Sequence, residues 1–209
     1  MNSPSMHPDW LQNIKSRLAH PLPGLESQLK MTSLNRGESW EIREDHRKSG
    51  VLALFYPYLG EPHLVFMERT QDGKVHGGQI SFPGGKMEPS DPNVKATALR
   101  EAEEELAIPA SEVELLGSLT ELYIPPSNFM VYPSVGYLPY RPDFIPSPNE
   151  VARVVEVALP ELLDSANLKS LYHPVGDGRK IKAPAFEVRG NVIWGATAMM
   201  LSELLDIVR

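Results

Sequence analysis

The sequence predicts a mixed α/β (α+β) fold in which one mixed β-sheet is sandwiched between helices. Two apolar, strand-like runs at 51–59 and 64–69 are joined by Gly60-Glu61-Pro62, and such a junction is typical of a hairpin turn. Apolar residues recur at helical spacing over 94–106, and further strand-like and helix-like segments follow to the end of the chain. A length of 209 residues suits one domain with an ample core.

The remaining elements follow in order along the chain. A short amphipathic set predicts a helix at 8–19, and a segment interrupted by proline and glycine continues to about residue 45. We therefore divide the chain into an N-terminal helical extension packed on the domain, residues 1–44, and the domain itself, residues 45–209. Further strands are expected at 79–82, 112–119, 129–137 and 151–158, a short helix at 160–164, a hairpin of 180–188 with 192–194, and a closing helix at 196–208.

Composition and charge argue against several classes of function. The chain has no cysteine, which excludes disulfides and a thiol nucleophile. A net charge of −7 without a basic tract disfavours a nucleic-acid partner. No apolar run approaches membrane-spanning length and no signal-peptide pattern occurs, so we expect a cytoplasmic protein without a membrane partner. A homodimer is compatible with these features.

The most informative stretch is an acidic segment, in which four carboxylates occupy five positions of one predicted helix: Arg100-Glu101-Ala102-Glu103-Glu104-Glu105. Ser90 or Asp91 is expected to cap this helix, and Pro92 suits its first turn. One apolar face is defined by Val94, Ala98, Leu99, Ala102 and Leu106. The same face provides the reference for placing the four glutamates.

The helical positions of the glutamates predict different roles. At about 100° per residue, Glu101 and Glu105 fall together on one border of the apolar face, with Glu104 next to them and further out. Glu103 falls on the other side. Because an unpaired charge at the edge of a core is costly, binding of a hard cation such as Mg²⁺ by Glu101, Glu105 and Glu104 is the economical interpretation. The alternative is a solvated acidic helix in which Arg100 is the internal counter-ion.

The residues before the helix complete a family signature. Residues 79–82 predict a short strand that ends at Pro83-Gly84-Gly85, and paired glycines let a backbone turn sharply and approach a ligand closely. With the acidic helix, this segment resembles the Nudix box of the Nudix hydrolases, at Gly85, Asp91, Arg100-Glu101, Glu104-Glu105 and Ile108. The chain departs from the usual box in three ways: a loop longer by one residue, Asp91 in place of Glu, and Ala107 in place of glycine.

The resemblance implies a Nudix fold and a metal-dependent hydrolase of a nucleoside diphosphate linked to another group. Its cofactor would be Mg²⁺ or Mn²⁺, held by Glu101, Glu104 and Glu105. Divalent ions would screen the diphosphate and lower the pKa of a bound water. Arg100 would orient the box through ion pairs with neighbouring carboxylates. Glu150, just before the 151–158 strand, would be a further ligand or the general base, unless it is a surface residue.

A second motif, within residues 63–85, resembles the coenzyme A pyrophosphatases of this family. The residues that fit its spacings are Arg69, Thr70, Lys74, Gly78 and Phe82-Pro83-Gly84-Gly85. The implied reaction gives 3′,5′-ADP and 4′-phosphopantetheine or its acyl form. Arg69 and Lys74 would supply cations for the extra 3′-phosphate of coenzyme A, beside Gly84 and Gly85, unless they are surface cations.

Two alternative functions stay open at this point. One is a Nudix pyrophosphatase for another nucleotide derivative, such as ADP-ribose or a nucleotide sugar. The other is a non-catalytic Nudix-fold protein that binds nucleotides or regulates. The intact Arg-Glu-x-x-Glu-Glu sequence argues against the second alternative, because a protein that only binds needs no metal cluster.

Overall fold

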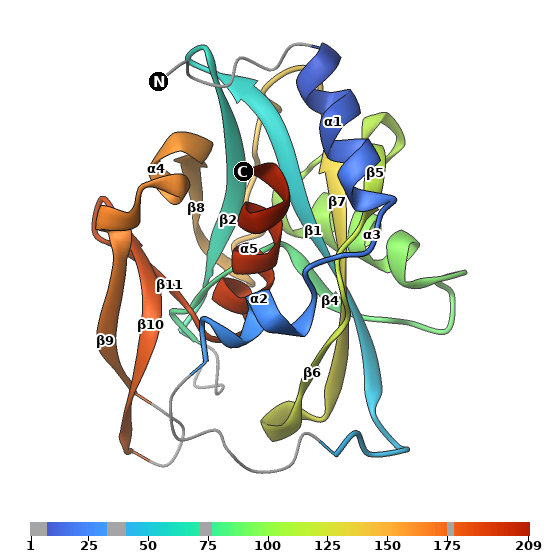
Figure 1. Ribbon diagram of the computed structural model, residues 1–209. Coiled ribbons are helices and arrows are strands. Elements are labelled where there is room, and N and C mark those ends of the chain that lie inside the picture. The colour runs from blue at the N-terminus through green and yellow to red at the C-terminus, as the bar shows by residue number, and fades with distance from the viewer. Residues whose placement is uncertain (1–7, 33–40, 72–76, 175–177) are drawn as a thin grey trace.

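The computed structural model describes residues 8–32, 41–71, 77–174 and 178–209 (Figure 1). Its helices are α1 (Pro8–Leu18), α2 (Leu25–Leu29), α3 (Val94–Leu106), α4 (Leu159–Leu163) and α5 (Gly195–Val208). Its strands are β1 (Arg47–Tyr58), β2 (Glu61–Arg69), β3 (Ile80–Ser81), β4 (Gly84–Lys86), β5 (Glu114–Ser118), β6 (Leu122–Ile124), β7 (Phe129–Tyr137), β8 (Val151–Ala158), β9 (Leu168–Pro174), β10 (Lys180–Val188) and β11 (Asn191–Trp194).

The main sheet is mixed, as predicted. Its eight strands centre on β1, which pairs in parallel with β7 and antiparallel with β2 and β4. Strand β2 also pairs with β3 and β8, and β7 with β5 and β6, all antiparallel. A second, three-stranded antiparallel sheet has the order β11-β10-β9.

Strand β1 separates two hydrophobic cores, because successive side chains of a strand point to opposite faces. Its residues Val51, Ala53 and Phe55 belong to the core that contains the apolar residues of α1 and α5. The alternate residues of β1 belong to the core beneath α3 (Leu52, Leu54 and Tyr56 with Ala98, Ala102 and Leu106). Helices α2 and α5 lie in front of the sheet in Figure 1, on the side opposite α3. The expected sheet between helices is confirmed.

Helix α1 packs on the sheet and on α5, and α2 packs on α5. Ile14, Leu18 and Met31 are buried in the same core as the apolar residues of α5. The carboxylate of Glu203, in α5, is fully buried and accepts hydrogen bonds from the amide of Gly24 and from Gln28 Nε2. The side chain and amide of Thr120 donate to the same carboxylate. These contacts connect α2, α5 and the segment between β5 and β6.

The prediction of the cap of α3 was wrong. Asn93 is the N-cap, and its side chain accepts hydrogen bonds from the amides of Lys95 and Ala96. Asp91 lies two residues earlier and is buried, where its carboxylate accepts from the amide of Glu88 and from Arg100 instead. Pro92 therefore precedes the cap and is not in the first turn.

Other differences concern short elements. Gly84 and Gly85 were expected only to end a strand, but they begin β4, which pairs with β1. The hairpin between β1 and β2 turns at Leu59 and Gly60, both with positive φ, so Glu61 and Pro62 already belong to β2. Helix α2 and strands β6 and β9 had no counterpart in the prediction.

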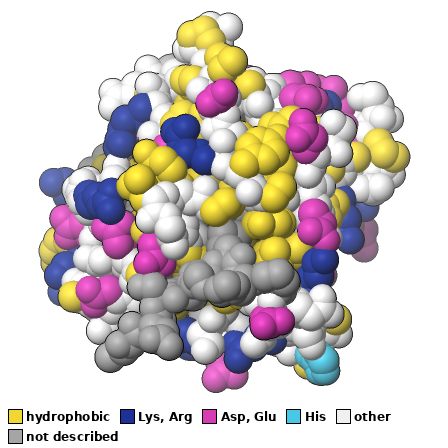
Figure 2. Space-filling model, turned by 90° about the horizontal axis from the view of Figure 1, so that it is seen from above, with side chains coloured by type: hydrophobic (Ala, Val, Ile, Leu, Met, Phe, Trp, Pro, Cys, Tyr) yellow, Lys and Arg dark blue, Asp and Glu magenta, His cyan; other side chains and the backbone are white. Residues whose placement is uncertain are grey.

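The described surface bears on two of the expected absences. On the face shown in Figure 2, the described Lys and Arg side chains are interspersed with Asp and Glu, without a continuous basic area. Within the described ranges, no helix has the length and apolar character needed to cross a membrane.

Candidate active site

The acidic helix α3 lies directly against the central strand β1. A side chain at Gly50, in β1, would overlap the carbonyl oxygen of Val94 and approach the amide of Ala98 within 2.9 Å. Glycine at this position therefore permits the close approach of helix and strand. The apolar residues Ala98, Ala102 and Leu106 face the core, so the border of the helix that carries the glutamates is fixed relative to the sheet.

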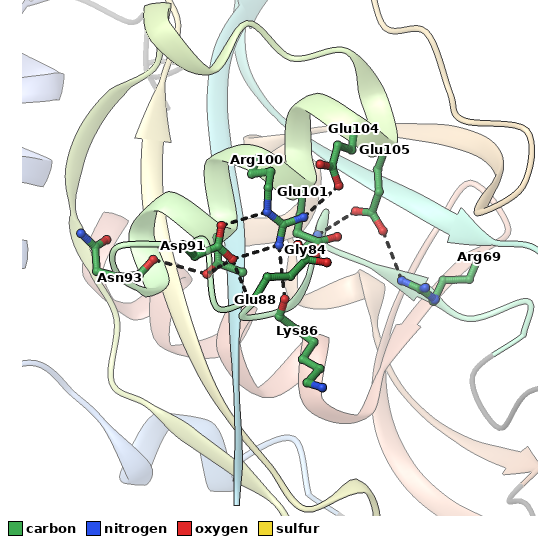
Figure 3. A network of polar contacts seen from close by, with 11 residues as sticks. Arg69, Gly84, Lys86, Glu88, Asp91, Asn93, Arg100, Glu101, Glu104 and Glu105 are labelled. Atoms are coloured by element: carbon green, nitrogen blue, oxygen red, sulfur yellow. Dashed lines mark hydrogen bonds and ion pairs between the residues drawn. The ribbon is translucent and has the colours of Figure 1, made fainter.

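Glu105 is the most buried of the four glutamates, with 1% of its surface exposed. Its Oε2 accepts a hydrogen bond of 2.8 Å from the amide of Gly84, and its Oε1 lies 3.4 Å from Nη1 of Arg69 (Figure 3). Burial raises the pKa of the Glu105 carboxyl to about 8, against the opposing effects of the Gly84 amide and Arg69. A cation at this carboxylate would favour its ionised form.

Glu101 lies next to Glu105 on the same border of α3, as predicted. A side chain at Gly85 would come within 2.5 Å of the Glu101 carboxylate carbon. The two glycines of β4 thus contact the two carboxylates, one by a hydrogen bond and the other by close approach. Burial raises the pKa of Glu101, while Arg100, whose Nη2 is 2.9 Å from Oε1, acts in the opposite direction.

Arg100 joins three carboxylates around the box (Figure 3). Its Nε and Nη2 donate to the two oxygens of Asp91 at 2.9 and 3.0 Å, and its Nη1 donates to Glu104 at 2.8 Å. Together with the Glu101 contact, these are the ion pairs expected of a residue that orients the box. The hydrogen bonds from Arg100 hold the pKa of Asp91 well below its usual range.

The other two glutamates of α3 are exposed. The side chain of Glu104 is 56% exposed and reaches Arg100 across one turn. Glu103 is exposed as well, and no ion pair involving it occurs among the described residues. As predicted, Glu104 lies further out than Glu101 and Glu105, whereas the deeper burial of Glu105 compared with Glu101 was not predicted.

Glu150 lies near this cluster although it is about fifty residues away in the sequence. It is exposed, just before β8, and its carbonyl oxygen accepts from the amide of Thr70. After burial and the nearer charges, its negative charge contributes to the raised pKa of both Glu101 and Glu105. Lys74, the second expected cation, lies outside the described residues.

A cavity of about 520 Å³ opens beside these groups. Its lining includes three charged residues, Arg69, Lys86 and Glu150, together with Gly84 and Gly85. The rest of the lining is largely apolar and aromatic, and it includes Leu122, Tyr123, Ile124, Phe129, Trp194 and Met200. The first turn of α5 also lines the cavity.

Sequence reasoning had not assigned roles to this second part of the lining. The residues belong to β6, β7, β11 and α5, which are far apart in the chain and meet only in the fold. Residues 124–127 and 193–198 also resemble segments of the coenzyme A pyrophosphatases, but this resemblance gives no role for a single side chain.

The donor set suits a hard divalent cation, because carboxylate oxygens are the ligands that Mg²⁺ takes from proteins. Among the described residues, Glu105 is buried with one long ion pair, from Arg69, so its ionised form is poorly compensated by these groups. Across the described ranges, no three acidic or histidine side chains already converge as a metal site. Arg100 and Arg69 contact the carboxylates instead, and a bound cation would compete with these ion pairs.

The fold and this site define a Nudix hydrolase. A family model described as the NUDIX domain matches residues 46–174, and the chain belongs to that family. Its members act on pyrophosphate bonds and generally need divalent metal ions.

Relatives with the same family name are 40% identical to this chain, and solved structures are similar to it at lower identity. Uncharacterized Nudix hydrolases NudL of Yersinia pestis (strain Pestoides F) and Yersinia pseudotuberculosis (serotype O:1b, strain IP 31758) are each 40% identical over 149 residues, 71% of this chain and 73% of theirs. A MutT/nudix family protein from Enterococcus faecalis has a TM-score of 0.51 at 13% identity, over 94% of this chain and 73% of its own. The NUDIX domain of Shewanella oneidensis NrtR, complexed with ADP ribose, has a TM-score of 0.48 at 15% identity, over 61% and 82%.

Proposed function

We propose that this enzyme hydrolyses the pyrophosphate bond of coenzyme A or one of its derivatives. The observation that carries the proposal is the two-part lining of the cavity. Its charged residues suit a diphosphate, and its apolar and aromatic residues suit a long, partly apolar arm such as pantetheine. ADP-ribose, the main alternative, has a polar sugar in place of that arm and would leave the apolar part of the cavity poorly used. The coenzyme A motif of the sequence supports the same choice.

In this proposal Glu101, Glu104 and Glu105 hold Mg²⁺ or Mn²⁺. The bound ions would screen the diphosphate and lower the pKa of a water. Gly84 and Gly85 fix the buried carboxylates and leave room for the substrate to approach. Arg100 keeps Glu101 and Glu104 in place through its ion pairs. Glu150, an exposed residue of the cavity lining, serves as a further ligand or as the base that takes the proton of the attacking water.

Arg69 takes a role that differs from the one suggested by the sequence. We expected it to bind the 3′-phosphate, but its guanidinium lies 3.4 Å from Glu105, the most buried candidate ligand. A cation in that place is better suited to neutralise the diphosphate that is cleaved. Arg69→Ala should therefore reduce kcat/KM about tenfold or more for coenzyme A and for dephospho-coenzyme A alike.

The experiment that tests the function is a substrate panel with product mass spectrometry. Coenzyme A, acetyl-coenzyme A, dephospho-coenzyme A, ADP-ribose and a nucleotide sugar are compared at equal concentration with Mg²⁺ and with Mn²⁺. We expect 3′,5′-ADP and 4′-phosphopantetheine from coenzyme A at the highest kcat/KM. Faster turnover of ADP-ribose would replace the coenzyme A proposal, and no turnover of any compound would favour a binding or regulatory protein.

The panel is repeated for Arg69→Ala and for Arg189→Ala as a control. Arg189 is an exposed cation in the turn between β10 and β11, where it pairs with Glu161. Arg189→Ala should leave the turnover of every substrate near that of the wild type. If Arg69→Ala lowers kcat/KM for coenzyme A but not for dephospho-coenzyme A, Arg69 binds the 3′-phosphate as the sequence suggested.

A further inference from the structure

The first turn of α5 presents unsatisfied backbone amides to the cavity. Helix α5 is 14 residues long, and the first four amides of a helix have no partner within the helix. Trp194 at the N-cap makes no capping hydrogen bond with its side chain, and no described group accepts from the amides of Gly195, Ala196 and Thr197. All three residues line the cavity.

The side chain of Thr197 adds a second donor at the same place. Thr197 is 7% exposed and lines the cavity. Within the described part of the chain, no group forms a hydrogen bond with its hydroxyl. The hydroxyl oxygen is also not one of the fully buried, unpaired polar atoms, so a ligand in the cavity can reach it. A hydroxyl that is nearly buried and unpaired costs free energy unless a ligand or water satisfies it.

The nearby side chains favour an anion with an aromatic group attached. Trp194, which also lines the cavity, stacks on His173 with ring centroids 4.2 Å apart and planes 7° from parallel. The indole is therefore a rigid aromatic surface beside the free amides. The described charged side chains of the lining are Arg69, Lys86 and Glu150, so only one carboxylate opposes an anion there.

We propose that the first turn of α5 is an anion subsite, which binds the 3′-phosphate of a 3′-phosphorylated adenosine whose base lies against Trp194. The amides of Gly195, Ala196 and Thr197 and the Thr197 hydroxyl donate to the phosphate oxygens, and the positive end of the helix dipole supports them. The subsite rests on the proposed function, because it identifies the part of coenzyme A that the apolar arm does not account for. It separates recognition of the 3′-phosphate from Arg69, which stays with the diphosphate.

Direct binding tests the subsite without relying on turnover. Calorimetry in metal-free buffer compares 3′,5′-ADP with 5′-AMP on the wild type, and we expect the 3′-phosphorylated nucleotide to bind at least tenfold more tightly. Thr197→Val keeps the shape of the side chain and removes the hydroxyl. It should weaken the binding of 3′,5′-ADP about five- to tenfold. Ser202→Ala is the matched control, since Ser202 is in the same helix, is also 7% exposed, and does not line the cavity.

A second pair of variants separates binding from stability. Ala196→Asp puts a carboxylate in the first turn, where it suits the helix dipole and should keep or raise the Tm, yet it should repel the phosphate and abolish the preference for 3′,5′-ADP. Ala196→Asn introduces a side chain of the same size as Ala196→Asp but without the charge, and it should weaken the binding of 3′,5′-ADP much less.

The possible outcomes distinguish this subsite from the coenzyme A activity. Equal binding of 3′,5′-ADP and 5′-AMP by the wild type would overturn the subsite, and so would a preference that survives Ala196→Asp. If the preference for 3′,5′-ADP disappears in Ala196→Asp and the wild-type enzyme does not cleave coenzyme A, the subsite is supported and the proposed substrate is wrong. If coenzyme A is cleaved, Thr197→Val should raise KM for coenzyme A more than for dephospho-coenzyme A.

Discussion

Glu105 is the residue on which the proposed metal site depends most, because it is almost completely buried and, among the described residues, pairs with one cation, Arg69, at 3.4 Å. Glu105→Gln should reduce kcat about a hundredfold or more with Mg²⁺ and leave the fold intact. The amide oxygen of glutamine can still accept from the Gly84 amide, and glutamine is neutral like the protonated carboxyl that the raised pKa of Glu105 favours, so the Tm without metal should not fall. Steady-state kinetics and thermal unfolding measure the two effects.

Glu103→Gln is the matched control, since Glu103 belongs to the same turn of α3 but is exposed and faces away from the cluster. Its turnover and metal dependence should stay near those of the wild type. Turnover of Glu105→Gln within a factor of about three of the wild type corresponds to only about 0.65 kcal/mol of barrier and would remove Glu105 from the metal ligands. An equal loss of turnover in Glu103→Gln and Glu105→Gln would mean that the active face of α3 has been assigned wrongly.

The raised pKa of Glu105 predicts a pH dependence of stability without metal. The carboxyl has a pKa of about 8 in the folded protein and an ordinary value of 4.5, so between these pH values the folded state binds more protons than the unfolded state. The free energy of unfolding contributed by Glu105 is then fully present below about 4.5 and is lost as the pH rises towards 8. The total is on the order of a few kcal/mol, and Glu101 acts in the same direction.

Unfolding in EDTA from pH 5 to pH 8 tests this expectation, and Glu105→Gln should show a smaller loss. A metal ligand must be ionised, so adding Mg²⁺ to weakly buffered protein at pH 7 should release about one proton per site and restore stability. If the free energy of unfolding in EDTA does not fall between pH 5 and pH 8, or if Mg²⁺ binds without release of a proton, Glu105 is already ionised.

Helix α3 shows how far local sequence patterns determine an element. Its apolar face and the position of Glu104 outside Glu101 and Glu105 follow from spacing within one helix, whereas the deeper burial of Glu105 compared with Glu101 was not predicted. Its cap was predicted wrongly, because Ser90, Asp91 and Asn93 are all good N-cap residues, and the choice depends on Arg100, which takes the carboxylate of Asp91. Strand β4 was missed for a similar reason, since its glycines form a strand only through pairing with β1.

The cap gives a prediction at the scale of the element. Asn93→Ala removes an acceptor for two backbone amides and should lower the free energy of unfolding by about 1 kcal/mol. Ser90→Ala, at the cap position first expected, should change it by less than about half as much. Chemical denaturation of both variants provides the measurement, and an equal or larger loss in Ser90→Ala would contradict the observed cap.

The site as a whole combines residues that local patterns cannot bring together. Arg69 meets Glu105 across 36 residues, and the cavity joins strands and a helix from both halves of the domain. Motifs in the sequence identified the candidate metal ligands, because these lie within one helix. The cavity lining at Phe129, Trp194 and Thr197 required the sheet order and the position of α5, which no spacing in the sequence specifies.

At the scale of the whole molecule, the N-terminal helices share a core with the Nudix domain. Trp10 packs edge-to-face on Phe55 of the central strand, with ring centroids 5.2 Å apart. Arg17 donates to the carbonyl oxygen of Ile207 near the end of α5. Because Ile14 is 2% exposed within the core of α5, we expect α1 to unfold together with the domain and not before it.

Ile14→Ala tests whether the extension is part of one cooperative unit. Removal of a buried isoleucine side chain should cost about 2–4 kcal/mol, because it loses apolar contact and leaves a cavity. Gln12→Ala, an exposed change two residues away in the same helix, should cost less than about 0.5 kcal/mol. Urea unfolding is followed in a Trp40→Phe, Trp194→Phe background by tryptophan fluorescence, which then reports Trp10 in α1, and by far-ultraviolet circular dichroism, which reports the whole domain. Both signals should change in one transition whose midpoint shifts in Ile14→Ala and not in Gln12→Ala. An early separate transition, with the domain midpoint unchanged in Ile14→Ala, would show that α1 is an appendage whose packing on α5 adds nothing to the stability of the active site.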